Sequence, residues 1–270
     1  MSTPIICLDN INSSFAASGD TPTDEQSFPH ENATDYTHPL RQFRTGNDAA
    51  NGNQLKLENT SGASVTVGAV LIDNVNIDII RCEPPTQASN ATTVVDSRTG
   101  RRKAVFIFSS GVAIADGATL TIEVASGGAS TPDINETHIG GVSIWSYAGT
   151  YDFPGAGIQG LEWSVTNPQA VNTYSGGVTE PIDIGEPFVT LKTPQLNYLP
   201  EVTDSGQSAN QMAILSEIIR RGAAPVLFYE NNGNIEKAYN MRLLASKPIK
   251  TIDRLTDQVT AVSLTFVETI

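Results

Sequence analysis

The chain has 270 residues and a net charge of −13 at pH 7. Surfaces that bind a phosphate backbone concentrate Lys and Arg, so this acidic balance argues against a nucleic-acid ligand. No stretch approaches the roughly 18 apolar residues of a membrane-spanning helix, and we expect no membrane span. Charged residues make up only 17% of the chain, below the typical value of about 25%, which suits a β-rich surface that faces solvent or other subunits.

Residues 1–40 are polar and contain Pro22, Pro29 and Pro39. We predict an extended N-terminal arm that carries one short strand at residues 4–8. Such an arm either packs on a neighbouring subunit or forms a partly ordered loop.

Residues 41–150 carry the pattern of a β-sandwich domain of the jelly-roll type. Residues 54–58 and 64–67 alternate apolar and polar side chains, which places the apolar ones on one face of a sheet. Residues 69–72 are a continuous apolar run, as expected for a buried central strand. Short strands at a spacing of roughly 8–12 residues with Gly-rich turns are typical of a sandwich. Further strands are expected at residues 76–81, 104–108, 111–114, 119–124 and 138–147.

Residues 151–270 predict a smaller C-terminal β unit that carries one α-helix near residues 209–221. Ser208 is a good N-cap, and Gln211 three residues later completes a capping box. Gly222 is expected to end the helix as its C′ residue. Strands are expected at residues 161–166, 188–191, 226–229, 239–245 and 261–267.

Residues that could carry chemistry are scattered along the chain. The histidines, His30, His38 and His138, form no spaced metal-binding or catalytic pair. Asp73 and Asp78 flank a loop after a predicted strand; paired acids serve glycoside hydrolysis, and an Asx-turn with a solvated strand end is the structural alternative. We therefore predict no catalytic, cofactor-binding or metal site, and a protein that is not an enzyme.

The cysteines and the basic run also favour a structural interpretation. Cys7 and Cys82 cannot supply a four-thiolate metal site, and two positions alone do not establish a disulfide, so two free thiols are the favoured interpretation. The only dense basic run, Arg98, Arg101, Arg102 and Lys103, lies beside turn residues and predicts a basic hairpin tip.

Three segments follow one another in a characteristic order. Residues 39–45 (PLRQFRT) come first, residues 54–58 (QLKLE) form an alternating strand, and residues 69–77 (AVLIDNVNI) form an apolar strand that ends in a polar loop. This order resembles virion proteins of tailed phages that carry a galactose-binding-like (discoidin-like) jelly roll. Phe43-Arg44-Thr45 matches the family's first element with Phe in place of Trp, and Asp73-Asn74 matches its polar loop without the His.

The resemblance implies a structural component of a bacteriophage tail: the tail tip, the baseplate or the distal-tail ring. Such a protein is located in the virion and made in the host cytoplasm. Its partners would be other virion tail proteins and further copies of itself in a ring, joined through strand edges and apolar patches. The residues predicted to make these contacts are Phe43, Arg44, Trp145, Tyr147 and Tyr151.

Two alternatives stay open. A carbohydrate-binding module for host-surface attachment would bind a host glycan with loops at residues 41–45 and 73–76, at one end of the sandwich, together with an exposed aromatic side chain. A polysaccharide-degrading enzyme would depend on Asp73 and Asp78, and its turnover would be lost in Asp73→Asn or Asp78→Asn.

Overall fold

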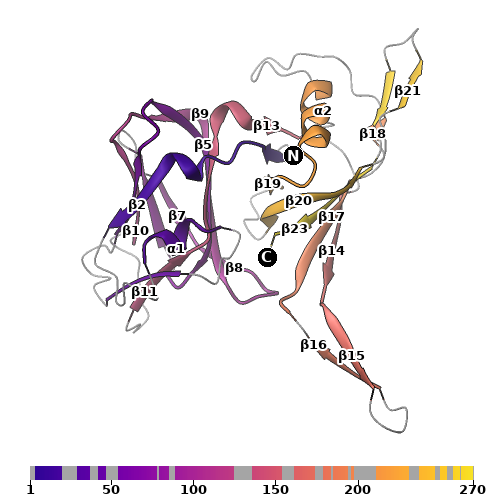
Figure 1. Cartoon of the computed structure of the whole chain (residues 1–270), viewed down its shortest axis with the longest axis horizontal. Coiled ribbons are helices and arrows are strands. Elements are labelled where there is room, and N and C mark those ends of the chain that lie inside the picture. Colours follow the sequence, from indigo (N-terminus) through magenta and orange to yellow (C-terminus); the bar gives the residue numbers. More distant parts are fainter. Residues whose placement is uncertain are drawn as a thin grey trace. The chain divides into compact units, whose positions relative to one another are not determined.

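The computed structural model describes most of the chain (Figure 1). The described residues are 4–19, 29–36, 42–46, 54–77, 79–84, 89–124, 136–153, 161–173, 179–183, 185–193, 196–197, 211–230, 237–246, 250–253, 258–261 and 263–269. Among them the fold is mainly β, with several antiparallel sheets and two α-helices, as the sequence predicts.

The chain divides into two compact units. The first unit comprises residues 2–150 and 226–239, and the second comprises residues 151–225 and 240–270. The chain passes between the units within strands β13, β19 and β20. Residues 226–239, predicted as part of the C-terminal unit, therefore belong to the first one.

The elements in chain order begin with those of the first unit. They are β1 (Ile5–Cys7), η1 (Asn12–Ser14), β2 (Phe15–Gly19), α1 (Glu31–Thr34), β3 (Gln42–Gly46), β4 (Gln54–Asn59), β5 (Val65–Val75), β6 (Ile79–Glu83), β7 (Ser89–Thr92), β8 (Val94–Val95), β9 (Arg102–Ile114), β10 (Thr119–Val124), β11 (Glu136–Gly140), β12 (Val142–Ser146) and η3 (Tyr147–Gly149). The elements that follow are β13 (Thr150–Asp152), β14 (Glu162–Thr166), β15 (Gln169–Thr173), β16 (Thr179–Asp183), β17 (Phe188–Lys192), β18 (Leu196–Asn197), α2 (Gln211–Arg221), β19 (Pro225–Tyr229), β20 (Ala238–Ser246), β21 (Lys250–Asp253), β22 (Gln258–Ala261) and β23 (Leu264–Glu268).

Two antiparallel sheets of the first unit enclose its main core. One has the strand order β2-β4-β10-β6-β7, and the other has the order β3-β11-β5-β9-β8, with β12 also paired to β5. Leu55 and Leu57 of β4 are fully buried while Lys56 between them is exposed, as a half-buried strand requires. These leucines share one apolar cluster with Val70 and Ile72 of the other sheet. The predicted β-sandwich is therefore present.

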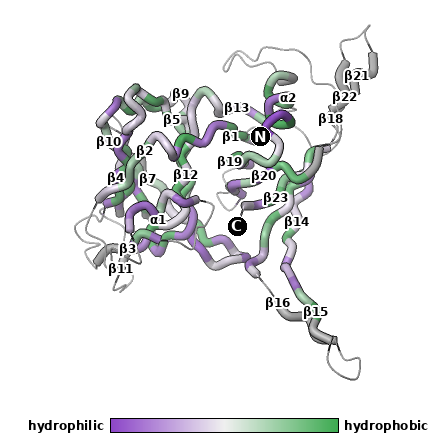
Figure 2. The backbone as a smooth tube through the Cα atoms, viewed as in Figure 1, coloured by the Kyte–Doolittle hydropathy of each residue, from purple (hydrophilic) through white to green (hydrophobic). Residues whose placement is uncertain are grey.

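Strand β5 is buried on both faces, which explains its continuous apolar run. Val70 and Ile72 join the core between the two sheets, whereas Ala69 and Leu71 point into a second cluster with Leu227 of β19. β19 pairs with β1, so these two strands form a third layer over the central sheet (Figures 1 and 2). Burying a Leu or Val side chain contributes about 1.5–3 kcal/mol, and β5 gains this on both sides.

The described part of the predicted N-terminal arm packs into the first unit. The expected strand at residues 4–8 is β1, and β2 adds an edge to the sheet beside β4. Asn12 holds the segment in place: its Oδ1 accepts a hydrogen bond from Ile144 N at 2.7 Å, and its Nδ2 donates to Val142 O at 2.8 Å and to Thr34 O at 2.9 Å. The oxygen and the nitrogen of the Asn12 amide thus take the place of backbone groups as hydrogen-bond partners.

The second unit contains the strand order β20-β23-β17-β14 and the helix α2. α2 buries Leu215 and Ile218, and Gly222 after it has φ +57°, the left-handed conformation predicted for its C′ position. The proposed N-cap, Ser208, lies outside the described residues. Glu268 Oε2 accepts a hydrogen bond from Val189 N at 2.9 Å, which ties β23 to β17. No helix in the described ranges has the length and apolar character needed to cross a membrane.

Candidate functional site

Two of the predicted contact residues, Phe43 and Trp145, lie inside the first unit. Phe43 is 1% exposed and stacks on the His30 ring, with ring centroids 4.8 Å apart. Trp145 is fully buried, and its Nε1 donates a hydrogen bond to Ser143 Oγ at 3.0 Å. Neither side chain presents surface to a partner, because Phe43 belongs to the core between the two sheets and Trp145 to the second apolar cluster with Leu227. The sequence predicts a strand at residues 138–147, which includes Trp145, and no strand at Phe43, and it does not predict which of these side chains is buried.

Arg44 lies on β3 opposite His138 of β11. Its Nε donates to Gln42 Oε1 at 3.0 Å. Burial, and then the nearby Arg44 charge, lower the pKa of His138 to about 4, so this imidazole is neutral at pH 7. This pair is part of the antiparallel pairing of β3 with β11.

Tyr147 and Tyr151 are both partly buried. Tyr147 sits in a notch formed by two glycines: a Cβ on Gly68 would lie 2.6 Å from its Cα, and a Cβ on Gly111 would lie 2.7 Å from its Cγ. Its hydroxyl donates to Ser109 O at 3.3 Å. Tyr151 lies on β13 and belongs to the second unit. The five predicted residues therefore do not form one contact patch.

The acidic pair considered for glycoside hydrolysis cannot be placed as a pair. Asp73 Oδ2 lies 3.7 Å from Arg101 Nη2, and Asp78 lies outside the described residues. The two segments considered for glycan binding do come to neighbouring strands: β11 pairs with β3 on one side and contacts β5 through Ile139 opposite Val75. Asn76 Oδ1 accepts a hydrogen bond from His138 N at 2.9 Å across this junction.

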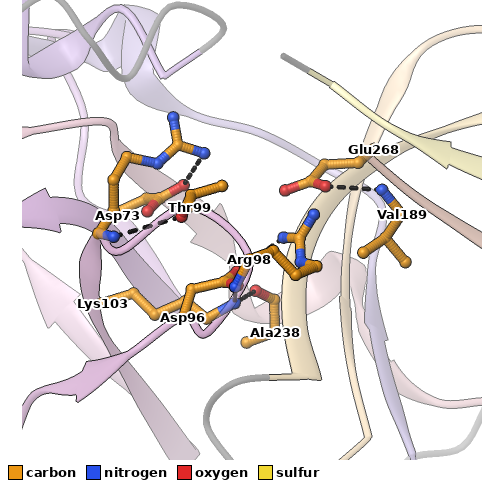
Figure 3. Close-up of polar contacts among 9 residues, drawn as sticks. Asp73, Asp96, Arg98, Thr99, Lys103, Val189, Ala238 and Glu268 are labelled. Atoms are coloured by element: carbon orange, nitrogen blue, oxygen red, sulfur yellow. Dashed lines mark hydrogen bonds and ion pairs between the residues drawn. The ribbon is translucent and has the colours of Figure 1, made fainter. Parts of the chain in front are cut away.

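The basic run near residue 100 forms the predicted hairpin between β8 and β9, but its charges are used inside the fold (Figure 3). The Lys103 side chain is 2% exposed, and its Nζ lies 3.2 Å from Asp96 Oδ2 and donates to Ala238 O at 3.2 Å. The same nitrogen lies 3.9 Å from the centroid of the Tyr239 ring. Arg98 Nη2 donates to Asp96 Oδ2 at 2.7 Å.

This group of residues Asp96, Arg98, Lys103 and Tyr239, the latch, joins strand β9 to the start of β20. Burial opposes ionisation of Asp96, but the Lys103 and Arg98 charges outweigh it and hold the pKa of that carboxyl below its usual value. The buried ammonium is therefore matched by a carboxylate, a carbonyl and an aromatic face. This matching of a buried charge indicates a structural role, in which the latch holds residues 226–239 against the sandwich.

Both cysteines are free, buried thiols, as predicted. Burial raises the pKa of Cys7 and that of Cys82 to about 12. At neutral pH both therefore remain protonated, and a thiol is a much weaker nucleophile and metal ligand than a thiolate. Within the ranges that the structure describes, no three His, Cys, Asp or Glu side chains gather as a metal-binding group.

The candidate interaction surface is a β-ribbon of the second unit, made of β14, β15, β16 and β17 and called the ribbon here (Figure 1). Val165 lies opposite Val189, and Trp163 lies opposite Leu191. Opposed residues of an antiparallel pair share a face, so Val165 lies on the same side as the buried Val189 and Leu191. Val165 is nevertheless 54% exposed.

A second exposed valine lies beyond β14. Val171 of β15 is 63% exposed, and the residues between it and Val165 are mostly polar. β15 and β16 form a two-stranded sheet of their own among the described strands. An isolated two-stranded ribbon is marginally stable in water, and its apolar side chains would gain about 1.5–3 kcal/mol each from being covered.

Comparison with models of known protein families and with curated proteins finds no match for this chain. The functional proposal therefore depends on the ribbon.

Proposed function

We propose that this protein is a structural component of a bacteriophage tail (tail tip, baseplate or distal-tail ring) and that it acts by association with other protein chains. The observation that carries the proposal is the ribbon, where the core-facing side of β14 continues past the core of its own unit at Val165. Exposed apolar positions on a projecting two-stranded ribbon favour an element that is completed by a neighbouring chain.

The phage assignment draws its support from the order of the sequence segments. Phe43-Arg44-Thr45, residues 54–58 and residues 69–77 follow one another as in galactose-binding-like virion proteins. A mainly β fold with a sandwich agrees with that order at the level of architecture. The partners would be other virion tail proteins and copies of this chain, in a virion assembled from proteins made in the host cytoplasm.

Particle labelling tests this function directly. Antibodies against the full chain, coupled to gold, would be applied to particles purified from the source culture and viewed in negative stain. We expect label at the tail, and none with antibody that has been absorbed with the purified protein. Purified particles that carry no label, with the protein found only in the particle-free fraction, would contradict the proposal.

A carbohydrate-binding role remains a second candidate because one observation favours it. The proposed glycan loops are residues 41–45 and 73–76; of these, residues 42–45 lie on β3 and residues 73–75 on β5, the two strands that flank β11. Glycan-array binding by the purified chain that is lost in Arg44→Ala, with unchanged unfolding behaviour, would support this role. Equal binding by both proteins would remove it.

A further inference from the structure

One side of the ribbon is the edge of its sheets. β14 ends the strand order β20-β23-β17-β14, and β15 pairs with β16 in a separate two-stranded sheet. β14 and β15 follow each other along the same side of the ribbon, with residues 167–168 between them. On the side that these two strands turn away from β17 and β16, no further strand follows among those that the structure describes. This side is called the β14–β15 edge.

The exposure of Val165 follows from its position at this edge. Val189 lies opposite Val165 and shares its face of the sheet. Because β17 lies between β14 and β23, Val189 has a strand on either side and is only 3% exposed, whereas Val165 is 54% exposed. Val171 of β15, on the same edge, is 63% exposed. A strand added beside β14 and β15 would give both exposed valines the neighbour that Val189 already has.

β14 and β15 lack the features by which edge strands discourage pairing with another chain. Both are five residues long, pair without a register shift, and contain no Pro, Gly, Lys or Arg. The other described edge strands of five residues each contain such a residue: Gly19 in β2, Arg44 and Gly46 in β3, and Pro181 in β16. The remaining described edge strands, β7, β8, β13, β18 and β21, have at most four residues. Short length, basic side chains, Gly and Pro all weaken strand addition, so the β14–β15 edge is the one best suited to it.

The charges on β14 and its partner strand are confined to one end of this edge. Glu162, the first residue of β14, is the only charged residue of β14 and β15. Lys192 lies opposite Glu162 on β17, and their charged groups are 3.8 Å apart. Residues 163–173 carry no charge. A segment that pairs along these residues therefore needs uncharged side chains rather than a charge of either sign.

An extended chain fits this edge better than a helix or a folded surface does. Its N–H and C=O groups can pair with an edge strand, and its side chains at alternate positions can lie beside Val165 and Val171. A helix could cover the valines but has its backbone groups already paired. The net charge of −13 on each chain opposes the approach of a second copy, which favours a different protein.

We propose that the β14–β15 edge receives an extended segment of a different protein by β-strand addition, a segment without Pro and with apolar side chains at alternate positions. This inference rests on the proposed assembly function and names the mode of contact and the chemistry of the partner.

Binding of a synthetic strand to the full chain tests the mode of contact. The probe is the peptide Lys-Thr-Val-Thr-Val-Thr-Val-Thr-Lys with a fluorescent label, titrated with the purified protein and followed by fluorescence anisotropy. The control peptide has the same sequence with N-methyl groups on two adjacent central residues, which blocks both of its edges and leaves its side chains and charge unchanged. We expect the unmethylated peptide to bind and the methylated one to bind about tenfold more weakly or worse, because main-chain hydrogen bonds supply the affinity in strand addition.

Substitutions in the full chain test where the peptide binds. Val165→Lys and Val171→Lys should each weaken peptide binding by about tenfold or more, because a Lys on an edge strand opposes pairing. The matched control is Val95→Lys, which makes the same change of charge at a valine that is 41% exposed on β8, an edge strand of the first unit. It should bind the peptide as the wild type does, and circular dichroism should show the same β content in all three variants.

A wild type that does not bind the peptide would overturn the inference, as would equal binding of the methylated peptide or equal weakening by Val95→Lys. Dimers of the wild type that are lost in Val165→Lys, measured by light scattering, would assign the edge to a second copy and reject the different partner. Gold label on the phage tail together with any of these results would leave the assembly function standing and reject only strand addition. Unlabelled particles together with methylation-sensitive binding at Val165 and Val171 would reject the phage-tail function and keep the edge as a binding site.

Discussion

The latch of the first unit buries charged side chains, whereas the ribbon of the second unit exposes apolar ones. At the latch, Lys103 and Asp96 are almost fully buried, and the chain supplies every partner that the ammonium contacts. At the ribbon, Val165 and Val171 are left more than half exposed. Charges that are buried and matched stabilise the fold, whereas exposed apolar groups are available for the protein contact that we propose.

Residues 226–239 and the ribbon also differ in the contacts that they make. Residues 226–239 return to the first unit and are held there by the Ala238 carbonyl and the Tyr239 ring. The ribbon lies within residues 161–193. Within it β14 pairs with β17 and β15 pairs with β16, and β17 also pairs with β23. The first arrangement stabilises a domain, and the second leaves apolar side chains exposed, as the proposed contact requires.

The largest effect is expected at the latch. Asp96→Ala would leave the Lys103 ammonium buried without its carboxylate, which costs about 3–5 kcal/mol in comparable sites. Urea denaturation followed by tryptophan fluorescence would measure the free energy of unfolding. Lys103→Met, which removes the charge and keeps the apolar stem, should lose clearly less. A change within about 0.5 kcal/mol for Asp96→Ala, the range of ordinary surface substitutions, would show that the latch is not structural.

The next effect is expected at the notch that holds Tyr147. Gly111 has φ +66°, and a Cβ there would lie 2.7 Å from both Thr66 Cγ2 and Tyr147 Cγ. Gly111→Ala should therefore lose about 3 kcal/mol, from the left-handed backbone and from overpacking together. Gly62→Ala is the matched control, because Gly62 has φ +77° and open space around its Cβ position; it should lose about 1 kcal/mol. Equal losses would mean that Tyr147 moves aside freely.

A smaller effect distinguishes the ribbon from the core on the same two strands. Val189 is 3% exposed and Val165, opposite to it, is 54% exposed. Val189→Ala should lose about 2 kcal/mol because it leaves a cavity, whereas Val165→Ala should stay within about 0.5 kcal/mol in the dissociated protein. Thermal denaturation of the two variants at low concentration would compare them. A large loss for Val165→Ala would place that side chain in the fold and weaken the case for a contact surface.

The smallest effect is expected from pH. The pKa of Asp96 is lower in the folded protein than its ordinary value, which is about 3.9 in an unfolded chain. Its contribution is therefore complete above that value and is lost as the pH falls through the folded pKa. Unfolding free energies of wild type and Asp96→Asn should converge as the pH falls below about 4. At low pH the wild type should lose less unfolding free energy than Asp96→Ala loses at neutral pH, because a protonated carboxyl still accepts hydrogen bonds. A constant difference down to the lowest pH would contradict the lowered pKa.

Much of the sandwich could be predicted because its signals are local. Alternation at residues 54–58 and the apolar run at residues 69–72 each record how many faces of a strand are buried, and Gly222 records the left-handed turn that ends α2. The contact residues fared differently. Phe43 and Trp145 are predicted contact residues, yet an aromatic side chain is equally suited to a core and to an interface, and the packing of the sheets buries both.

The sequence by itself determined the β class, the helix near residues 209–221 and the hairpin at the basic run, since each depends on side chains a few residues apart. Only the tertiary structure decided that Lys103 contacts Ala238 and Tyr239 and that residues 226–239 complete the first unit. It also decided that Val165 stays exposed although Val189 opposite to it is buried. These features join segments up to 135 residues apart. No local pattern carries them, because the burial of a side chain depends on what the rest of the chain brings against it.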